Sequence, residues 1–358
     1  MQPFLKNKNI LVTGCCGTVG RELLKQLTSS HDVADITGID NNESELFFVE
    51  QEYIGRGNTC FYLADVRDQE KLCRMMQNVD VVFHTAALKH VVLCERSPFE
   101  AIQTNILGVQ NIIYAANANH VEKVIFTSSD KAVNPTNVMG TAKLMGEKII
   151  TSANANLKNG PTIFASTRFG NVLGSRGSVI PIFKAQIKKG GPVTLTDPDM
   201  TRFIMSISEA VRLVVDSAGL ICGGEVFITK MPVIRIKDLA EVMVAELAPS
   251  FDRNPADIEI RIIGTKPGEK MYEELMNHEE TRRAIELKQY FAVTPAFQSL
   301  YRDIDYQYPD VISEAVTNPY NSADEPVLSK QAIKEFLVSN HLLAAQDTSE
   351  HPDERYWP

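Results

Sequence analysis

Ionisable side chains gather in one short stretch, SSDKAVNPTNVMGTAK, which runs from Ser128 to Lys143. Asp130 and Lys131 are neighbours there, and a carboxyl group and an amine are groups that can hold or transfer protons. Met139 and Lys143 follow with i, i+4 spacing, which places both on one face of a helix. Enzymes that remove a hydroxyl proton usually have an ionisable group where Met139 stands, and a thioether cannot ionise.

Each of these residues also has a purely structural interpretation. Met139 could simply pack in the protein interior, and Lys143 could be a solvated surface lysine. Asp130 and Lys131 could form an ordinary surface ion pair. The sequence leaves these alternatives open.

The elements around this stretch would bring its two halves together. KVIFTSSDK predicts a strand that ends at Ser128, Ser129, Asp130 and Lys131. Pro135 disfavours helix before it, and Thr136 or Asn137 can cap a helix that begins near Val138. Lys143 lies off the expected core stripe of that helix, which consists of Val138, Ala142, Met145 and Ile149.

Apolar runs alternate with helix-patterned segments through the first half of the chain. The runs lie at residues 9–14, 34–40, 59–65, 80–87, 123–129 and 161–170. They are nearly continuous in apolar residues, as expected when helices cover both faces of a sheet. This alternation predicts βαβ units and a doubly wound α/β fold with a parallel sheet, on which ligands bind at the carboxyl ends of the strands.

Beyond about Asn171 the alternation fades, and Gly and Pro separate shorter elements. We expect residues 1–171 to form the sheet domain, to which part of the later chain returns. Residues 172–345 are expected to form a smaller, interleaved cap, and residues 346–358 a polar tail.

A glycine triplet follows the first predicted strand in TGCCGTVG. Gly14, Gly17 and Gly20 would let the backbone turn tightly against a pyrophosphate, at the start of a helix that opens with Thr18 and Val19. The alternative is that these glycines serve helix packing only.

An acidic residue stands at the matching distance from the glycines. Asp40 ends the second predicted strand, where a carboxylate can bind the adenosine ribose, and it would repel a 2′-phosphate. The following Asn41, Asn42 and Glu43 offer no arginine, so the pattern favours NAD over NADP.

Two further strand ends complete the predicted cofactor site. Asp65 could receive the adenine amino group, with Val66 beside it, or Asp65 could instead cap a helix. Ala86 and Ala87 are small enough for a cofactor to lie against the backbone. The predicted cofactor-binding residues are therefore Gly14, Gly17, Thr18, Val19, Gly20, Asp40, Asp65, Val66, Ala86, Ala87 and Lys143.

Composition excludes several classes of protein. The formal charge of −9 argues against a nucleic-acid-binding surface. The six cysteines follow no zinc-ligand spacing, so we expect no metal and reduced, idle thiols. The sequence shows neither a signal peptide nor an apolar run near the ~18 residues of a membrane span, and we expect a cytoplasmic protein.

Several longer motifs resemble one family. TGxxGxxG with M-x-x-x-K in place of Y-x-x-x-K resembles the extended short-chain dehydrogenase/reductases, which have a Rossmann-like fold. HTAALKHV, SSDKAVNPTNVMG, TRFGNVLGSRGSVIP, DPDMTRFIM and PGEKMYEEL resemble the polysaccharide-biosynthesis branch that contains the UDP-N-acetylglucosamine 4,6-dehydratases. The resemblance extends from about Asn9 to Asn277.

The resemblance implies a lyase that oxidises C4 of a UDP-sugar with NAD, removes water across C5 and C6, and returns the hydride at C6. It implies Lys131 as the base at C5, Asp130 as the acid at the C6 hydroxyl, and Ser129 as the partner of the C4 oxygen. It also implies the substrate-binding residues Lys89, His90, Asn171, Arg176, Arg202 and Glu269.

Met139 departs from the wider family, where Tyr deprotonates the hydroxyl that is oxidised. Members with Met are associated with retention of C5 configuration. The C4 base is then Asp130, or Lys143 acting through water or the nicotinamide ribose. A nucleotide-sugar C4 epimerase and a non-catalytic NAD and nucleotide-sugar binding protein remain alternatives. Relatives usually pair through helices of the sheet domain, which implies a homo-oligomer.

Overall fold

The computed structural model describes residues 3–155, 161–174, 178–264, 269–297 and 304–343. The chain divides into two compact units, and each unit is assembled from three segments. Unit 1 comprises Met1–Gly170, Ile207–Lys230 and Glu274–Asn321, and unit 2 comprises Asn171–Ser206, Met231–Glu273 and Ser322–Pro358. The tail predicted at residues 346–358 lies outside the described residues.

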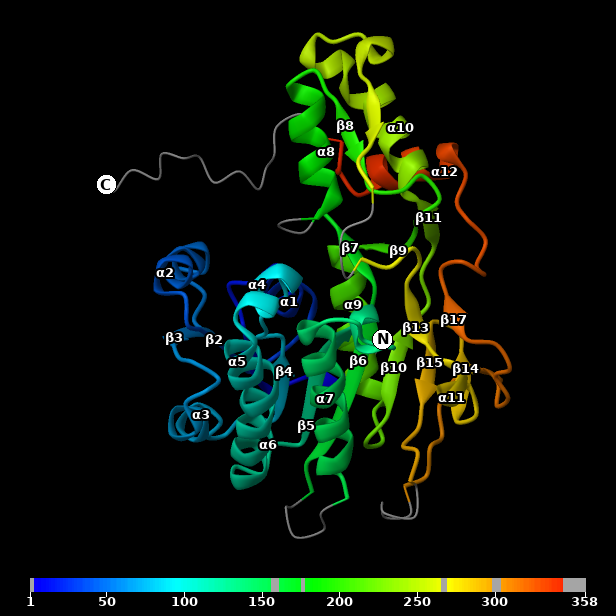
Figure 1. The fold of residues 1–358 in the computed structure, drawn as a ribbon. Helices are drawn as coiled ribbons and strands as arrows, with labels where there is room; N and C mark the ends of the chain where they lie inside the picture. Colours follow the sequence, from blue (N-terminus) through cyan, green and yellow to red (C-terminus); the bar gives the residue numbers. More distant parts are fainter. Residues whose placement is uncertain (1–2, 156–160, 175–177, 265–268, 298–303, 344–358) are drawn as a thin grey trace. The chain divides into compact units, whose positions relative to one another are not determined.

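Unit 1 contains a ten-stranded sheet in the order β16-β14-β15-β10-β6-β5-β4-β1-β2-β3 (Figure 1). Seven neighbouring strands are parallel, which confirms the predicted doubly wound α/β fold. They are β1 (Asn9–Thr13), β2 (Asp35–Asp40), β3 (Thr59–Leu63), β4 (Val81–His84), β5 (Lys123–Ser129), β6 (Ile163–Phe169) and β10 (Val226–Thr229). Three antiparallel strands extend the sheet: β15 (Tyr290–Val293), β14 (Ala284–Leu287) and β16 (Val311–Ser313).

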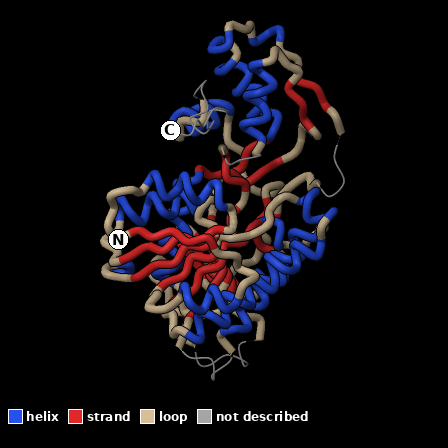
Figure 2. Tube along the Cα trace, turned by 90° about the vertical axis from the view of Figure 1, so that its left-hand side faces the viewer, coloured by secondary structure: helices blue, strands red, loops and turns tan. Residues whose placement is uncertain are grey.

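Helices lie on both sides of this sheet (Figure 2). On one side α1 (Thr18–Ser30) packs against α9 (Ile207–Leu220), and α9 contacts β5 and β6. A second group consists of α3 (Gln69–Met75), α6 (Gly108–Ala118) and α7 (Val138–Ala153), which pack side by side over a buried apolar core. The burial of both faces explains why the central strands are apolar at nearly every position.

Shorter elements complete unit 1. α2 (Glu43–Glu52) contacts β2 and β3, while α4 (Val91–Arg96), α5 (Pro98–Ile102) and a π-helical turn (Gln103–Leu107) lie beside α6 and α7. β13 (Glu274–Met276) pairs with β17 (Tyr320–Asn321) and leads into α11 (His278–Thr281).

Strand β3 differs from the expectation of a fully covered sheet. It is the last strand of the sheet at that edge, and Tyr62 and Leu63 are 44% and 52% exposed. An edge strand lacks one neighbour, so its apolar sequence does not imply that both faces are buried.

The core stripe predicted for α7 is correct for Ala142, which is buried, and for Val138 and Ile149, which pack against apolar clusters, but wrong for Met145. Met145 is 47% exposed, and the buried face carries Met139, Ala142, Lys143, Gly146, Glu147 and Ile150. The helix is therefore rotated so that Lys143 faces inward. The start of α7 is as predicted, because the Asn137 side chain accepts a hydrogen bond from the Gly140 amide.

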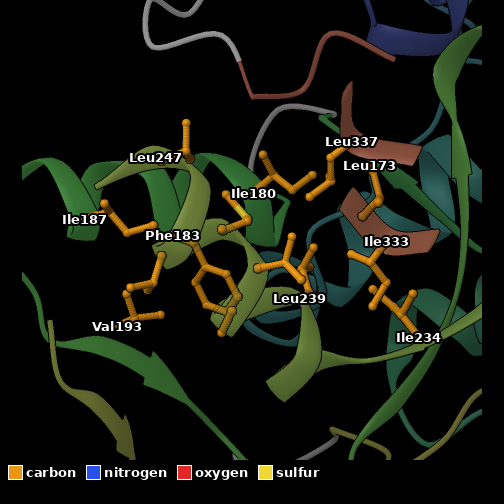
Figure 3. Close-up of a cluster of buried hydrophobic side chains, with 14 of the residues drawn as sticks. Leu173, Ile180, Phe183, Ile187, Val193, Ile234, Leu239, Leu247, Ile333 and Leu337 are labelled. Carbon is orange, nitrogen blue, oxygen red and sulfur yellow. The ribbon is translucent and has the colours of Figure 1, made fainter. Parts of the chain in front are cut away.

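Unit 2 has its own core. β7 (Asn171–Leu173), β9 (Thr201–Ser206) and β11 (Val233–Arg235) form one sheet, and β8 (Val193–Leu195) pairs with β12 (Ile260–Ile262). α8 (Val179–Lys188), α10 (Ile236–Leu247) and α12 (Lys330–Ser339) contribute apolar side chains, among them Phe183, Leu239 and Leu337 (Figure 3). Within the described ranges, helices long and apolar enough to cross a membrane are absent.

Candidate active site

The glycine-rich turn after β1 is closely packed. Gly14 has φ +68°, and a Cβ there would lie 2.7 Å from the Ala86 backbone. A Cβ on Gly20 would lie 2.7 Å from Cys15 Cα, so these two positions require glycine for packing. Gly17 is the N-cap of α1 and has no capping side chain, which leaves N–H groups of the first turn available to an anion.

Asp40 lies beside this turn at the end of β2. Its carboxylate accepts hydrogen bonds from the Cys16 and Asn42 amides, both at 3.0 Å. The Gly14 and Cys15 amides donate to the Ile39 carbonyl at 2.8 and 3.2 Å. The turn is therefore anchored to the end of β2, and Asp40 keeps lone pairs for a ribose.

Asp65 does not cap a helix, because Asp68 is the N-cap of α3 and accepts from the Lys71 amide. Asp65 instead accepts hydrogen bonds from Arg67 and from Asn41. Burial disfavours its charged form, but these hydrogen bonds outweigh burial and lower the pKa of Asp65. The Val66 side chain is buried in the core below.

A buried asparagine that the sequence reasoning missed holds the loop after β4. Asn105 Oδ1 accepts from the Leu88 amide at 2.8 Å, and its Nδ2 donates to the Leu88 carbonyl at 2.9 Å. This pair of bonds positions the loop that contains Ala86 and Ala87. An asparagine within the apolar run around QTNILG is the signal that could have identified it.

The Ser129, Asp130 and Lys131 side chains lie where β5 ends, as predicted. Lys131 Nζ donates to both carboxylate oxygens of Asp130, at 2.9 and 3.1 Å. The Asp130 side chain is 5% exposed and that of Lys131 is 35% exposed. The alternative that the two residues form an ordinary surface ion pair was therefore wrong. The Ser129 hydroxyl accepts from the Lys131 amide and fixes the turn.

Helix α7 approaches this turn closely because of Gly140, a second residue that sequence reasoning missed. A Cβ on Gly140 would clash with the Lys131 carbonyl oxygen and would lie 3.2 Å from Pro135. Glycine at this position thus determines how near α7 comes to the Asp130–Ala132 turn. Its place in VMGTAK, within the first turn of the helix that Asn137 caps, is a usable signal, since glycine is a poor helix former.

Lys143 is buried and tied to β5, so the solvated alternative was wrong. Its ammonium donates to the Thr127 carbonyl at 2.9 Å and lies 4.6 Å from the centre of the Phe126 ring. Burial lowers the pKa of Lys143 to about 8, although Glu147 opposes the shift. Lys143 is therefore held against Thr127, the β5 residue that directly precedes Ser128.

Met139 packs in an apolar cluster with Cys94 and Ala101 and is 3% exposed. The packing interpretation is thus correct for this residue. No ionisable atom replaces the usual tyrosine hydroxyl at this position, and any proton taken at the site goes to another group.

His84 is a buried polar residue at the end of β4. Its Nδ1 is hydrogen-bonded to Thr13 Oγ1 at 2.7 Å, and its Nε2 lacks a hydrogen-bond partner among the described residues. Burial, with a smaller contribution from Lys143, lowers its pKa to about 3. The ring is therefore neutral at physiological pH and serves the packing between β1 and β4.

Arg168 on β6 forms a buried ion triad with Glu147 of α7 and Glu280 of α11. Its guanidinium lies 2.6 Å from a Glu147 oxygen and 2.7 Å from a Glu280 oxygen. Burial opposes the charge, but the two carboxylates outweigh it and raise the pKa of Arg168. The triad fixes α7, which carries Met139 and Lys143.

The predicted substrate-binding residues divide between the units. Lys89 and His90 are exposed on unit 1, and Asn171, Arg202 and Glu269 belong to unit 2. Arg202 is buried and donates to the Thr201, Lys270 and Met271 carbonyls, so binding a diphosphate would require replacing some of these contacts. Arg176 lies outside the described residues.

Comparisons with known proteins identify the family of this chain. The family described as polysaccharide biosynthesis protein matches residues 10–295. The chain is 51% identical to an uncharacterized membrane protein, MJ1061, of Methanocaldococcus jannaschii, over 93% of this chain and 96% of that one.

Two relatives with named activities are 38% identical to this chain. One is an inverting UDP-N-acetylglucosamine 4,6-dehydratase of Campylobacter jejuni, with 85% of this chain and 87% of the relative covered. The other is a UDP-glucose 4-epimerase of Rickettsia conorii, with 93% and 96% covered.

A solved structure of Pen from Bacillus thuringiensis is 40% identical, has a TM-score of 0.85, and covers 94% of this chain and 98% of its own. Relatives therefore include both nucleotide-sugar dehydratases and epimerases. The chain belongs to the polysaccharide biosynthesis protein family.

Proposed function

We propose that this chain is an NAD-dependent UDP-N-acetylglucosamine 4,6-dehydratase that forms a UDP-4-keto-6-deoxy-N-acetylhexosamine for surface glycan biosynthesis. The observation that carries the proposal is the contact between Lys131 and Asp130 at the carboxyl end of β5, since elimination of water requires one base and one acid close together. Retention of C5 configuration is proposed from Met139.

The residues around the glycine turn fit a bound dinucleotide. Gly14 and Gly20 let the turn pack closely against Ala86 and Cys15, the uncapped first turn of α1 after Gly17 is proposed to bind the pyrophosphate, and Asp40 suits an unphosphorylated ribose. Asp65 is proposed to face the adenine, and Ala86, Ala87 and Lys143 the nicotinamide half. NAD supplies the hydride acceptor for C4 and the hydride donor for C6.

The elimination step uses the two neighbours in opposite roles. With a ketone at C4, the C5 hydrogen is acidic, and the uncharged Lys131 amine accepts it as a proton. Asp130 donates its proton to the C6 hydroxyl, which leaves as water. The C5 proton then returns from Lys131, so the nitrogen ends as it began.

We propose Asp130 as the C4 base, with Lys143 as the alternative; with Asp130 in this role, the proton shared by the Lys131–Asp130 ion pair must leave before the cycle begins, so that the Lys131 amine is uncharged. A carboxylate that accepts the C4 hydroxyl proton becomes the carboxylic acid that the next step needs, and the water carries that proton away. Asp130 and Lys131 thus complete a cycle without a proton from solvent. Lys143 is proposed to orient the nicotinamide ribose from its fixed place against Thr127.

Substrate contacts are proposed for the residues that the family resemblance implies. Lys89 and His90 would serve the sugar, and Asn171, Arg176, Arg202 and Glu269 the uridine diphosphate. Ser129 would donate to the C4 oxygen, while its own oxygen accepts from the Lys131 amide.

The purified protein, incubated with UDP-N-acetylglucosamine, is expected to yield the 4-keto-6-deoxy sugar without net NAD consumption, as judged by NMR of the product. In D2O, deuterium should enter C5 in the configuration of the substrate. Recovery of unchanged substrate from protein shown to contain NAD would refute the proposal.

The Rickettsia relative makes a C4 epimerase the second candidate. An epimerase needs no acid and base for elimination, so Asp130→Asn and Lys131→Met would leave it active. A non-catalytic binding protein is the third, and any rise in reduced nicotinamide absorbance on adding substrate would exclude it.

We also propose that the chain forms a homo-oligomer through α4, α5, α6 and α7. These helices are neighbours, and they expose large apolar side chains that water would otherwise contact. The exposed residues are Val92, Leu93, Phe99, Ile102, Tyr114 and Met145.

A further inference from the structure

We propose that Cys15, Cys16 and Asp40 form a binding site for a thiophilic divalent cation, and that this cation and the dinucleotide exclude each other. The two cysteines are consecutive in the glycine-rich turn, and the carboxylate comes from the end of β2. The sequence shows no metal-binding motif that contains these three residues, because Asp40 lies on the next strand, far from the two cysteines in the chain.

The three side chains already converge. The two sulfur atoms and a carboxylate oxygen of Asp40 all lie within 4.8 Å of one another. In a tetrahedral site with metal–sulfur distances of about 2.3 Å, two thiolates are about 3.8 Å apart, so the two sulfur atoms need to approach each other by at most about 1 Å. Among the residues that the structure describes, this is the one cluster of His, Cys, Asp or Glu with such spacing.

The backbone holds these ligands in place before any metal arrives. The Cys16 amide donates to Asp40 Oδ2 at 3.0 Å, and the Cys15 amide donates to the Ile39 carbonyl at 3.2 Å. Cys15 Sγ packs against Gly38, and a Cβ at position 38 would lie only 3.1 Å from this sulfur atom. Ligands fixed in this way lose little conformational entropy on binding.

The donor set decides the class of cation. Two sulfur ligands and one oxygen ligand favour Zn²⁺ or Cd²⁺ over Mg²⁺ and Ca²⁺, which require oxygen. Cys15 and Cys16 are buried, whereas Asp40 is only half-buried, so a cation enters from the side of the carboxylate. Three protein ligands leave one position for water.

Mutual exclusion follows from the shared carboxylate and rests on the proposed function, which assigns Asp40 to the adenosine ribose. A cation bound to Asp40 removes that acceptor and occupies space at the turn. The cation is thus an inhibitor of cofactor loading rather than a catalytic metal.

Cd²⁺ titration tests the site directly, because cadmium thiolates absorb in the ultraviolet. We use a background protein in which the three cysteines that are not buried, Cys60, Cys73 and Cys222, are replaced by Ser. One equivalent of Cd²⁺ should bind with a thiolate band. Cys16→Ser in this background should weaken Cd²⁺ binding by at least about 100-fold. Loss of a residue that only hydrogen-bonds to a metal ligand typically costs about 10–100-fold, and loss of the ligand itself should cost more.

Cys94→Ser in the same background is the matched control, since Cys94 is buried but lies in the Met139 cluster. It should bind Cd²⁺ like the background protein. Thermal unfolding of each variant verifies folding. Equal Cd²⁺ affinity of the background protein and of folded Cys16→Ser would overturn the site.

Competition is measured by adding NAD to the Cd²⁺ complex and following both the thiolate band and bound nucleotide. Loss of the band as NAD binds supports exclusion, and simultaneous binding overturns it. If metal-free protein binds no NAD, the proposed function fails, while the Cd²⁺ site is judged by Cys16→Ser alone.

Discussion

Lys131 Nζ lies 2.9 Å from Asp130 Oδ2, although the two residues are adjacent in the chain. Neighbours on a regular strand point to opposite faces of the sheet. The 3-10 turn over Asp130–Ala132, which begins directly after β5, brings both side chains to one side. The turn therefore creates the acid and base pair on which the proposed dehydration depends.

Removing either partner should stop dehydration. We expect Lys131→Met and Asp130→Asn to lower kcat by about 10²–10⁴-fold, the usual contribution of a positioned acid or base. Lys131→Met should also abolish deuterium entry at C5 in D2O, as measured by NMR. Lys148→Met, an exposed change on α7, is the control and should retain full activity. Wild-type rates in both pair variants would contradict the assignment.

Gly140→Ala should damage activity because a Cβ at this position meets the Lys131 carbonyl oxygen. Alanine favours helix by about 1 kcal/mol, so a loss cannot come from helix propensity. We expect kcat to fall at least about tenfold, since small displacements of catalytic groups are costly. Gly57→Ala, where a Cβ would meet nothing within 4 Å, should leave kcat unchanged. Normal kinetics of Gly140→Ala would show that the approach of α7 is unimportant.

Burial of Lys143 should make stability depend on pH. Its pKa is about 8 in the folded chain and 10.5 when unfolded, so the unfolded state binds more protons between these values. The folded state therefore gains stability as pH rises through this window, by roughly 3 kcal/mol in total. Urea denaturation should reveal this gain relative to Lys143→Met. The same comparison with Lys148→Met should show no such gain.

The ion triad around Arg168 should be sensitive to loss of one member. Arg168→Met leaves two buried carboxylates without their cation and should destabilise the fold by about 3–5 kcal/mol in urea denaturation. Replacing Arg168, Glu147 and Glu280 together by apolar residues should recover much of this loss. Arg261→Met, which breaks the exposed pair with Glu259, is the control and should not shift the midpoint. A small effect of Arg168→Met would mean that water reaches the triad.

The exposed apolar face of α4 to α7 should mediate self-association. Introducing charge with Phe99→Glu and Tyr114→Glu, residues that are 78% and 56% exposed, should lower the molar mass seen in light scattering after size-exclusion chromatography. Ile54→Glu introduces a charge at a residue that is 69% exposed and lies outside these helices, and it should leave the mass unchanged. A monomeric wild type would exclude the interface.

Local sequence determined the first six strands of the sheet, the glycine turn and the start of α7, whereas β10 and the antiparallel strands β14, β15 and β16 were not predicted as part of the sheet. Each of the predicted features depends on neighbouring residues: an apolar run bounded by turn residues, glycines at fixed spacing, and Asn137 after Pro135. For the same reason the sequence placed Asp130, Lys131 and Ser129 correctly at the end of β5. The family could also be predicted, because long motifs carry the resemblance.

Tertiary structure alone decided that the buried face of α7 includes Lys143 and Glu147, since contacts with Thr127 and Phe126 accommodate Lys143 and a contact with Arg168 accommodates Glu147. It also decided that β3 is an edge strand and that Asp68, rather than Asp65, caps α3. The convergence of Cys15, Cys16 and Asp40 joins residues on different elements. Periodicity describes one segment at a time, whereas burial and hydrogen bonding between segments depend on how the whole chain packs.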